Sequence, residues 1–341
     1  MPLAGPLALG LLLLVPHGDG VNGQEPVTSF LAQDGISDLD AVVVTGVKPG
    51  PGMWRVRHGH REVWILGTLQ PIPADVEWSA EPVREVLDTV DQVLWAPYYT
   101  VDVDTGFFGK LKLGYRMTRA SSNPDGKTLR DLLPDETYAR WLEAKARYLG
   151  GDSRVESKRP GIAAETLFKA AVEDAGLSLR PLVNRPILDA VRRRGIRSLA
   201  PATVVKLDAK AANRMLKDAR NHGLNDVECM VATLDVIEHE LPGMVANANA
   251  WAIGDLERIS FTRLQRKDAA CADAFTNNAV ADEYDLPDIR GSIARRWMEE
   301  VELALASNDS TLSVVPLQNL LGPGGYIEAL KARGYRVEAP E

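Results

Sequence analysis

Two pairs of side chains, each with a spacing of two residues, could do chemistry in this sequence. His58 and His60 flank a turn glycine, and Asp102 and Asp104 flank a valine. Residues two apart point to the same side of a strand, so each pair could bind a metal ion, and the histidines could also handle protons. Because turn histidines and strand-edge carboxylates are usually solvated, we favour solvent-exposed positions for all four.

A second group of glycines, hydroxyls and amides follows two apolar segments, one ending near residue 66 and one near residue 315. Its members are Gly67, Thr68, Gln70, Gln318, Asn319 and Gly322. In α/β proteins ligands bind at the carboxyl ends of strands, so we predict that these residues lie at neighbouring strand ends and form a polar binding site. Their amides can hydrogen-bond a ligand but carry no charge.

The elements that must position these residues come from both ends of the chain. Residues 53–66 predict a hairpin, followed by a helix over 78–88 and a buried strand over 92–96. Residues 311–337 repeat the order strand, loop, helix, strand. Helical periodicity dominates residues 127–306, with one helix over 207–221, and residues 98–114 are irregular. We therefore predict an α/β fold with a small central sheet built from the two terminal units and a large helical insertion, about 127–306.

The composition is that of a globular protein. The chain has 341 residues, of which 45% are hydrophobic and 25% are charged, and its formal net charge is −8. The densest basic cluster, Arg192 to Arg194 with Arg197, fits the solvated end of a helix. An acidic chain without a long basic run predicts no nucleic-acid partner.

The amino-terminal residues predict export. Residues 7–15 form an apolar run that is too short to span a bilayer but suits a secretory signal peptide. We expect a signal peptide over 1–23, a lead-in segment over 24–45 with an edge strand near 40–45, and a single domain over 46–341. No later segment predicts a transmembrane span, so we expect a periplasmic or secreted protein. A chain start slightly out of place is the alternative.

The two cysteines leave two interpretations open. Cys229 and Cys271 each lie in a segment with helical periodicity, and an even count in an exported chain permits one disulfide between two helices. Two unpaired thiols in the core are the alternative. No neighbouring residues have the spacing of a zinc site.

Several segments, in order along the chain, resemble the TraB/GumN family, which includes the Tiki metalloproteases. Residues 67–70 (Gly-Thr-Leu-Gln) match the family's Gly-Thr-X-His after a Trp-containing hairpin, and residues 251–255 match its Trp-X-X-Gly-Asp. Residues 315–325 and the Arg-Gly-Tyr at 333–335 match its carboxyl-terminal motif. The resemblance extends over about residues 53–337, which is most of the chain.

The resemblance also implies a metal site that this sequence has lost. The family's proposed ligands are two histidines and a glutamate, and their positions fall on Gln70, Asn319 and Ala96. An amide carbonyl is a weak neutral ligand and alanine is none, so these positions do not support metal-activated water. We therefore expect no metal, no cofactor and no catalytic residue at this site.

The sequence thus predicts an exported TraB/GumN-like protein that is catalytically inactive and keeps the cleft as a binding or structural element. An envelope protein or a peptide would suit it as a partner, although the sequence does not identify one. The alternative is a metal-dependent protease or hydrolase whose site has moved to His58, His60, Asp102 and Asp104.

Overall fold

The computed structural model describes residues 50–222, 226–276, 289–322 and 324–340. The predicted signal peptide, the lead-in segment and the edge strand near 40–45 lie outside these ranges. None of the helices in the described ranges combines the length and hydropathy that a membrane crossing requires.

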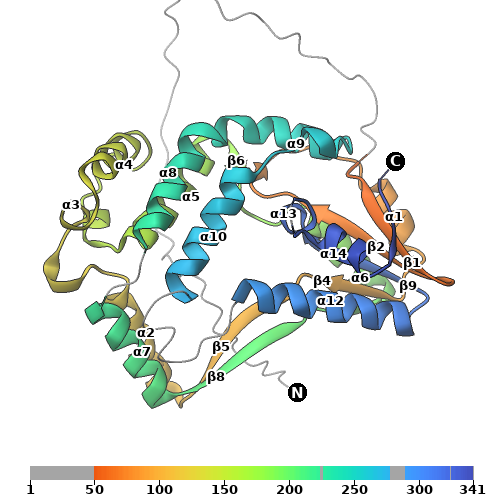
Figure 1. Ribbon diagram of the computed structural model, residues 1–341, viewed down its shortest axis with the longest axis horizontal. Helices are drawn as coiled ribbons and strands as arrows, with labels where there is room; N and C mark the ends of the chain where they lie inside the picture. Colours follow the sequence, from red (N-terminus) through yellow and green to blue (C-terminus); the bar gives the residue numbers. More distant parts are fainter. Residues whose placement is uncertain (1–49, 223–225, 277–288, 323, 341) are drawn as a thin grey trace, which may run out of the picture.

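A six-stranded mixed sheet forms the centre of the fold (Figure 1). Its strands, from edge to edge, are β10 (Arg336–Glu338), β1 (Met53–His58), β2 (Arg61–Thr68), β9 (Ser310–Pro316), β4 (Gln92–Trp95) and β7 (Arg197–Leu199). The hairpin β1–β2 and the edge strand β10 pair antiparallel, whereas β2, β9, β4 and β7 run parallel. Strands from the two ends of the chain therefore share one sheet, which confirms the predicted α/β fold.

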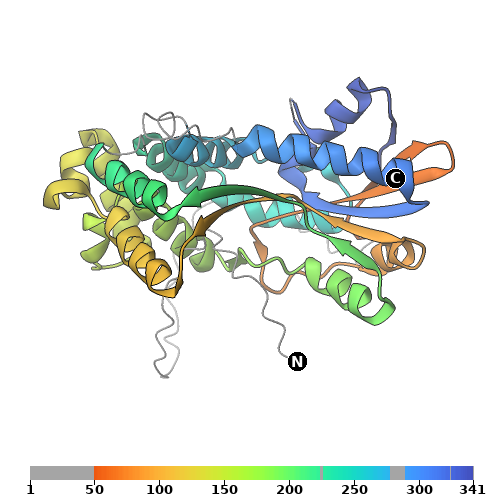
Figure 2. The same cartoon turned by 90° about the horizontal axis from the view of Figure 1, so that it is seen from below.

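Helices cover both faces of this sheet. Figure 2 shows α12 (Ile289–Ser307) on one face and α6 (Asn184–Arg194) on the other. Helix α14 (Tyr326–Ala332) packs against α12, and α1 (Glu81–Leu87) packs against α6. Because it is covered on both faces, β9 is buried along almost its whole length, as a central parallel strand must be.

A helical layer lies beyond the carboxyl ends of the parallel strands. Its main helices are α4 (Asp135–Tyr148), α5 (Pro160–Asp174), α8 (Val227–His239), α9 (Met244–Ala252) and α10 (Thr262–Thr276), with the short α3 (Leu129–Leu132) beside them. The sulfur atoms of Cys229 in α8 and Cys271 in α10 lie 2.01 Å apart and form a disulfide. The insertion is not wholly helical, because β7 joins the central sheet and β6 (Leu177–Ser178) pairs with β3 (Ile72–Pro73).

The largest difference from the predicted fold is a separate arm, built from residues that were expected to be irregular or only helical. Strands β5 (Tyr98–Asp104) and β8 (Ala202–Asp208) form a parallel two-stranded ribbon that leads to two packed helices, α2 (Phe107–Ala120) and α7 (Ala209–His222). Figures 1 and 2 show these four elements, which we call the arm, projecting from the sheet. Residues 98–114 are therefore regular, and the predicted helix over 207–221 begins two residues late, after a strand that the sequence analysis missed.

Candidate functional site

The three positions where the resemblance implies metal ligands follow the carboxyl ends of three adjacent strands, which we call the strand edge. Strands β2, β9 and β4 are adjacent and parallel, and Thr68 is paired with Pro316 in the register of β2 with β9. Gln70 lies two residues after the end of β2, and Ala96 directly follows β4, where its N–H donates to the Val314 carbonyl at 2.9 Å. Asn319 follows β9 in α13 (Leu317–Leu320), a helical turn where the sequence analysis had predicted only a loop.

Close packing fixes the end of β2. A Cβ atom on Gly67 would lie 2.6 Å from Leu317 Cδ1, so only glycine lets α13 approach this strand. The Trp251 indole N–H of α9 donates to the Gly67 carbonyl oxygen at 2.8 Å, and both groups are buried. The Thr68 hydroxyl donates to the Val315 carbonyl at 3.3 Å. Gly67 and Thr68 thus serve the junction of β2, β9 and α9 in this structure.

Gln70 is exposed, and little space lies beside it. The hollow that Gln70 helps to line has a volume of about 10 Å³, and its other lining residues include the apolar Leu69, Phe261 and Leu264 and the polar Glu240. That volume accommodates roughly one water molecule. A ligand larger than water does not fit this hollow, so a larger partner would contact Gln70 at the protein surface.

The amides after β9 have partners within the protein. The Gln318 Nε2 group donates to Asp268 Oδ2 at 2.7 Å, and the Gln318 carbonyl oxygen accepts from Gln265 Nε2 at 2.7 Å. Both partners belong to α10. Gly322 has a φ of +90°, in the left-handed region that favours glycine, and it continues the turn toward α14. Gln318 therefore ties the strand end to α10.

Asn319 joins the strand end to α14. Its side chain is a polar neighbour of the Tyr326 hydroxyl and by itself lowers the tyrosine pKa. Burial has the larger effect and raises the pKa of Tyr326 to about 12. The Tyr326 ring also stacks on Trp297 of α12, with the ring centroids 4.3 Å apart. The second ligand position of the family thus holds a helix–helix contact here.

Two carboxylates near this edge are occupied by protein donors. The carboxylate of Glu240, which is buried, accepts the backbone N–H groups of Arg263 at 2.7 Å and Leu264 at 3.1 Å, and so satisfies the start of α10. Asp268 accepts from Gln318 and forms an ion pair with Lys267 at 3.1 Å. Within the described residues, no three His, Cys, Asp or Glu side chains are grouped as a metal site would need.

The alternative metal site, made of His58, His60, Asp102 and Asp104, is not assembled in this structure. His58 and His60 lie at the tip of the β1–β2 hairpin, where His60 Nε2 is 3.7 Å from Asp309 at the amino-terminal end of β9. Asp102 and Asp104 lie in β5, which begins beyond the carboxyl end of β4. The two pairs therefore sit toward opposite ends of the parallel strands and cannot share one ion.

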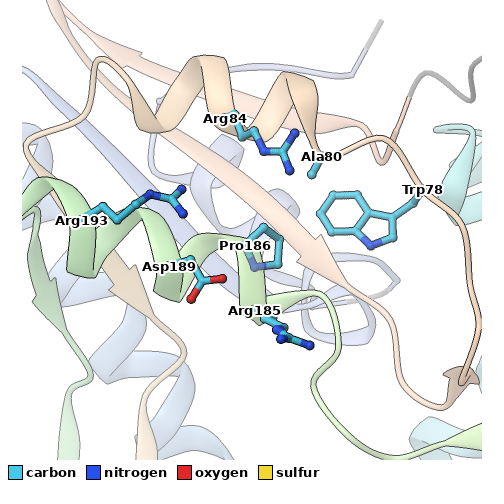
Figure 3. Close-up of a pocket in the computed structure, with 7 residues that line it drawn as sticks. All are labelled: Trp78, Ala80, Arg84, Arg185, Pro186, Asp189 and Arg193. Atoms are coloured by element: carbon cyan, nitrogen blue, oxygen red, sulfur yellow. The ribbon is translucent and has the colours of Figure 1, made fainter.

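A larger hollow lies between α1 and α6 (Figure 3). Its volume is about 280 Å³, and Trp78, Arg84, Arg185, Asp189 and Arg193 contribute to its lining. The three arginine residues are exposed, and Asp189 is paired with a further arginine on its own helix. In the predicted basic cluster, Arg192 to Arg194 are exposed at the end of α6, as expected, whereas Arg197 lies in β7 and donates to Gln92 and Asn308.

Comparison with known proteins identifies the family. The model of the TraB/PrgY/gumN family matches residues 52–339. The chain belongs to this family. Searches of curated proteins and of solved structures returned no match. The match covers the central sheet, the helical layer and the arm, so the TraB/PrgY/gumN region is the whole of the predicted domain except its ends.

Family membership allows the side chains at the strand edge to be compared with the metal ligands that the resemblance implies. In this TraB/PrgY/gumN chain the ends of three adjacent parallel strands present an amide, a methyl group and a second amide. The donor set therefore does not fit a divalent cation. Sequence reasoning missed Gln265 and Asp268, because no local pattern shows which distant helix lies over a strand end.

Proposed function

We propose that this TraB/PrgY/gumN protein lacks metal-dependent catalysis and uses the strand edge as a structural and binding element. The observation that carries this proposal is the identity of the side chains at three adjacent parallel strand ends, namely Gln70, Ala96 and Asn319. A neutral amide cannot offset the cost of dehydrating a dication, and alanine has no donor atom. No water would be activated by such a set.

The surrounding contacts support the same proposal. Asn319 is engaged with Tyr326, Gln318 with Asp268, and Glu240 with the start of α10. To bind a cation, any of these groups would first have to give up a partner inside the protein, which has an energetic cost. Gln70 is exposed and free of such contacts among the described residues, so it is the group best placed to meet a peptide or a protein partner.

We also propose that the protein works outside the cytoplasm, in the periplasm or after secretion. The disulfide between Cys229 and Cys271 supports this location, because structural disulfides persist in oxidising compartments. The apolar run at residues 7–15 supports it independently, because its length is that of a signal-peptide core. Cell fractionation of the full chain tests the location, and retention of an uncleaved chain in the cytoplasm would contradict it.

Metal content tests the proposed loss of catalysis. The purified full chain is incubated separately with Mn²⁺, Zn²⁺ and Co²⁺, dialysed, and its bound metal is measured together with hydrolysis of a broad peptide library. We expect far less than one ion per chain and no chelator-sensitive hydrolysis. One tightly held ion per chain with turnover that a chelator abolishes would refute the proposal.

A matched variant locates any metal that does bind. In the double variant His58→Ala, His60→Ala, the hairpin tip loses its histidines, whereas Gln70→Ala changes only the strand edge. Loss of bound metal in the hairpin variant alone would indicate adventitious binding at an exposed turn. Loss in the Gln70 variant would assign the metal to the family site and contradict the proposal.

A further inference from the structure

The arm has a hydrophobic core of its own, and this core is very small. Among the described side chains, Val103, Leu113 and Ala212 are its buried members, three further apolar side chains are partly buried against them, and the cluster is separate from the main core of the protein. Three buried side chains stabilise a ribbon and two helices only weakly. The arm therefore has few contacts of its own to hold α2 in place.

Helix α2 exposes more apolar surface than it buries. Phe107, Phe108, Leu111 and Tyr115 are 77%, 82%, 67% and 63% exposed, and we call these four side chains the outer face. On a helix with about 3.6 residues per turn they fall within an arc of roughly 100°. The buried Leu113 lies on the opposite side of the helix. Exposed apolar groups that share one face usually mark an interaction site.

Cationic side chains border the outer face on both sides. On the helical wheel Lys112 and Arg119 lie next to one border of the arc and Lys110 next to the other, and all three are exposed. Helix α2 contains four basic residues and no acidic residue, in a chain whose net charge is −8. On the neighbouring α7, the exposed Lys210 and Lys217 add further positive charge. The helical end of the arm is thus a cationic region of an acidic protein.

An apolar outer face bordered by cations favours one kind of binding partner for α2. An apolar face with aromatic and leucine side chains, flanked by lysine and arginine, is the pattern of helices that lie in the interface of a bilayer. Aromatic side chains suit the headgroup level, and the flanking cations attract anionic lipids. A second copy of the chain fits poorly, because pairing two α2 helices through this face would bring like charges together.

We propose that α2 docks the arm on an anionic phospholipid surface. The outer face enters the boundary between headgroups and acyl chains, and the lysine and arginine side chains contact lipid phosphates. This proposal does not depend on the loss of catalysis, because the arm shares no residue with the strand edge. It concerns binding to a membrane surface and not a crossing of the membrane.

Vesicle co-sedimentation of the full chain tests this proposal. Vesicles of phosphatidylcholine alone are compared with vesicles of phosphatidylcholine and phosphatidylglycerol. We expect binding to the anionic vesicles, weaker binding as salt is raised, and little binding to the neutral ones. The variant Phe108→Ser, Leu111→Ser should bind at least about tenfold more weakly, because two large apolar side chains are lost.

Charge variants measure the electrostatic contribution to vesicle binding. In the variant Lys110→Gln, Lys112→Gln we expect the affinity for anionic vesicles to fall about fivefold for each charge removed. The matched control, Arg185→Gln with Arg193→Gln, removes two exposed cations from α6 and should bind as the natural chain does. Leu142→Ser with Leu303→Ser is the corresponding control for the apolar pair, since both leucines are exposed outside the arm.

Several results would overturn the proposal. Equal binding to neutral and anionic vesicles, or no vesicle binding at all, would exclude an anionic lipid surface. Undiminished binding by the Phe108, Leu111 variant, with an unchanged thermal midpoint, would place the contact elsewhere. A dimer of the natural chain that this variant dissociates would instead assign the outer face to a second copy.

Discussion

Single side chains at the strand edge decide whether this scaffold can hold a metal ion. Gln70, Ala96 and Asn319 stand at the ends of β2, β4 and β9, which are neighbours in the sheet. Three adjacent strand ends are therefore present, but none of the three positions carries a charged ligand. The most direct test of the strand edge is therefore to restore the ligands by substitution and to measure whether the protein gains metal binding.

The triple variant Gln70→His, Ala96→Glu, Asn319→His should bind Zn²⁺ or Mn²⁺ with a stoichiometry near one. Two imidazoles and a carboxylate replace two amides and a methyl group, which supplies both charge and stronger ligands. Isothermal titration calorimetry measures the binding. The double variant without the glutamate is the control and should bind more weakly. If the triple variant binds no metal, Pro316 and the helical turn α13 have changed the edge, and the scaffold is no longer competent.

Because Tyr326 is buried, we expect this single side chain to make the protein less stable at alkaline pH. Burial raises its pKa from 10.0 to about 12, so the folded protein keeps this proton to a higher pH than the unfolded chain does. The stabilising contribution is complete below the unfolded pKa and is lost as the pH rises through the folded pKa. Its size is on the order of 2 kcal/mol.

The contribution of Tyr326 is checked by chemical denaturation, which gives the unfolding free energy at steps of roughly one pH unit between pH 9 and pH 12. The natural chain should lose more unfolding free energy across this window than Tyr326→Phe does, because phenylalanine has no proton to release. Tyr115→Phe, which changes an exposed tyrosine of α2, serves as the control and should follow the natural chain. Parallel curves for the natural chain and Tyr326→Phe would show that Tyr326 does not titrate as its burial implies.

Among the elements, α9 is coupled to the sheet by one buried hydrogen bond. The Trp251 indole N–H donates to the Gly67 carbonyl oxygen, and its ring also lies 5.5 Å from that of Trp78. The substitution Trp251→Phe leaves the carbonyl without this partner, so we expect the unfolding free energy to fall by about 1–3 kcal/mol. Urea denaturation measures the difference.

Trp64→Phe is the matched control for this prediction. The Trp64 indole donates to Glu62 at 2.9 Å within its own strand, where both side chains are partly exposed. Since water can replace that contact, the loss should stay below about 1 kcal/mol. Equal losses in the two variants would mean that the buried bond to Gly67 contributes nothing specific to the junction.

The elements differ in how clearly the sequence predicts them. The hairpin and α14 follow local rules, because their apolar positions have the period of a strand or of a helix that is buried on one face. Helix α2 breaks this rule: its outer face is apolar as well as its inner face, so no single-sided period exists. Strand β5 does alternate, since Val101 precedes Asp102 and Val103 precedes Asp104, but four residues of alternation are too few to predict a strand in a segment that otherwise lacks a regular period.

At the scale of the whole molecule, long-range pairing sets the limit of prediction. The parallel pairing of β2 with β9 joins residues 62–68 to residues 310–316, and the likeness of the two terminal units was enough to predict it. The pairing of β5 with β8 had no such likeness. The six residues of the predicted binding site do gather near one edge, but their contacts with α10 and α14 depend on packing that no local pattern shows.

The disulfide acts on the whole molecule because it joins α8 to α10 over a separation of 42 residues. In the chain-entropy account, a link of this length restricts the unfolded chain and stabilises the fold by about 2–4 kcal/mol. The variant Cys229→Ser, Cys271→Ser should lose stability of this order in urea denaturation. A reducing agent should lower the stability of the natural chain by a similar amount and leave the variant unchanged. An unaltered midpoint under reducing conditions would show that the link does not stabilise the fold.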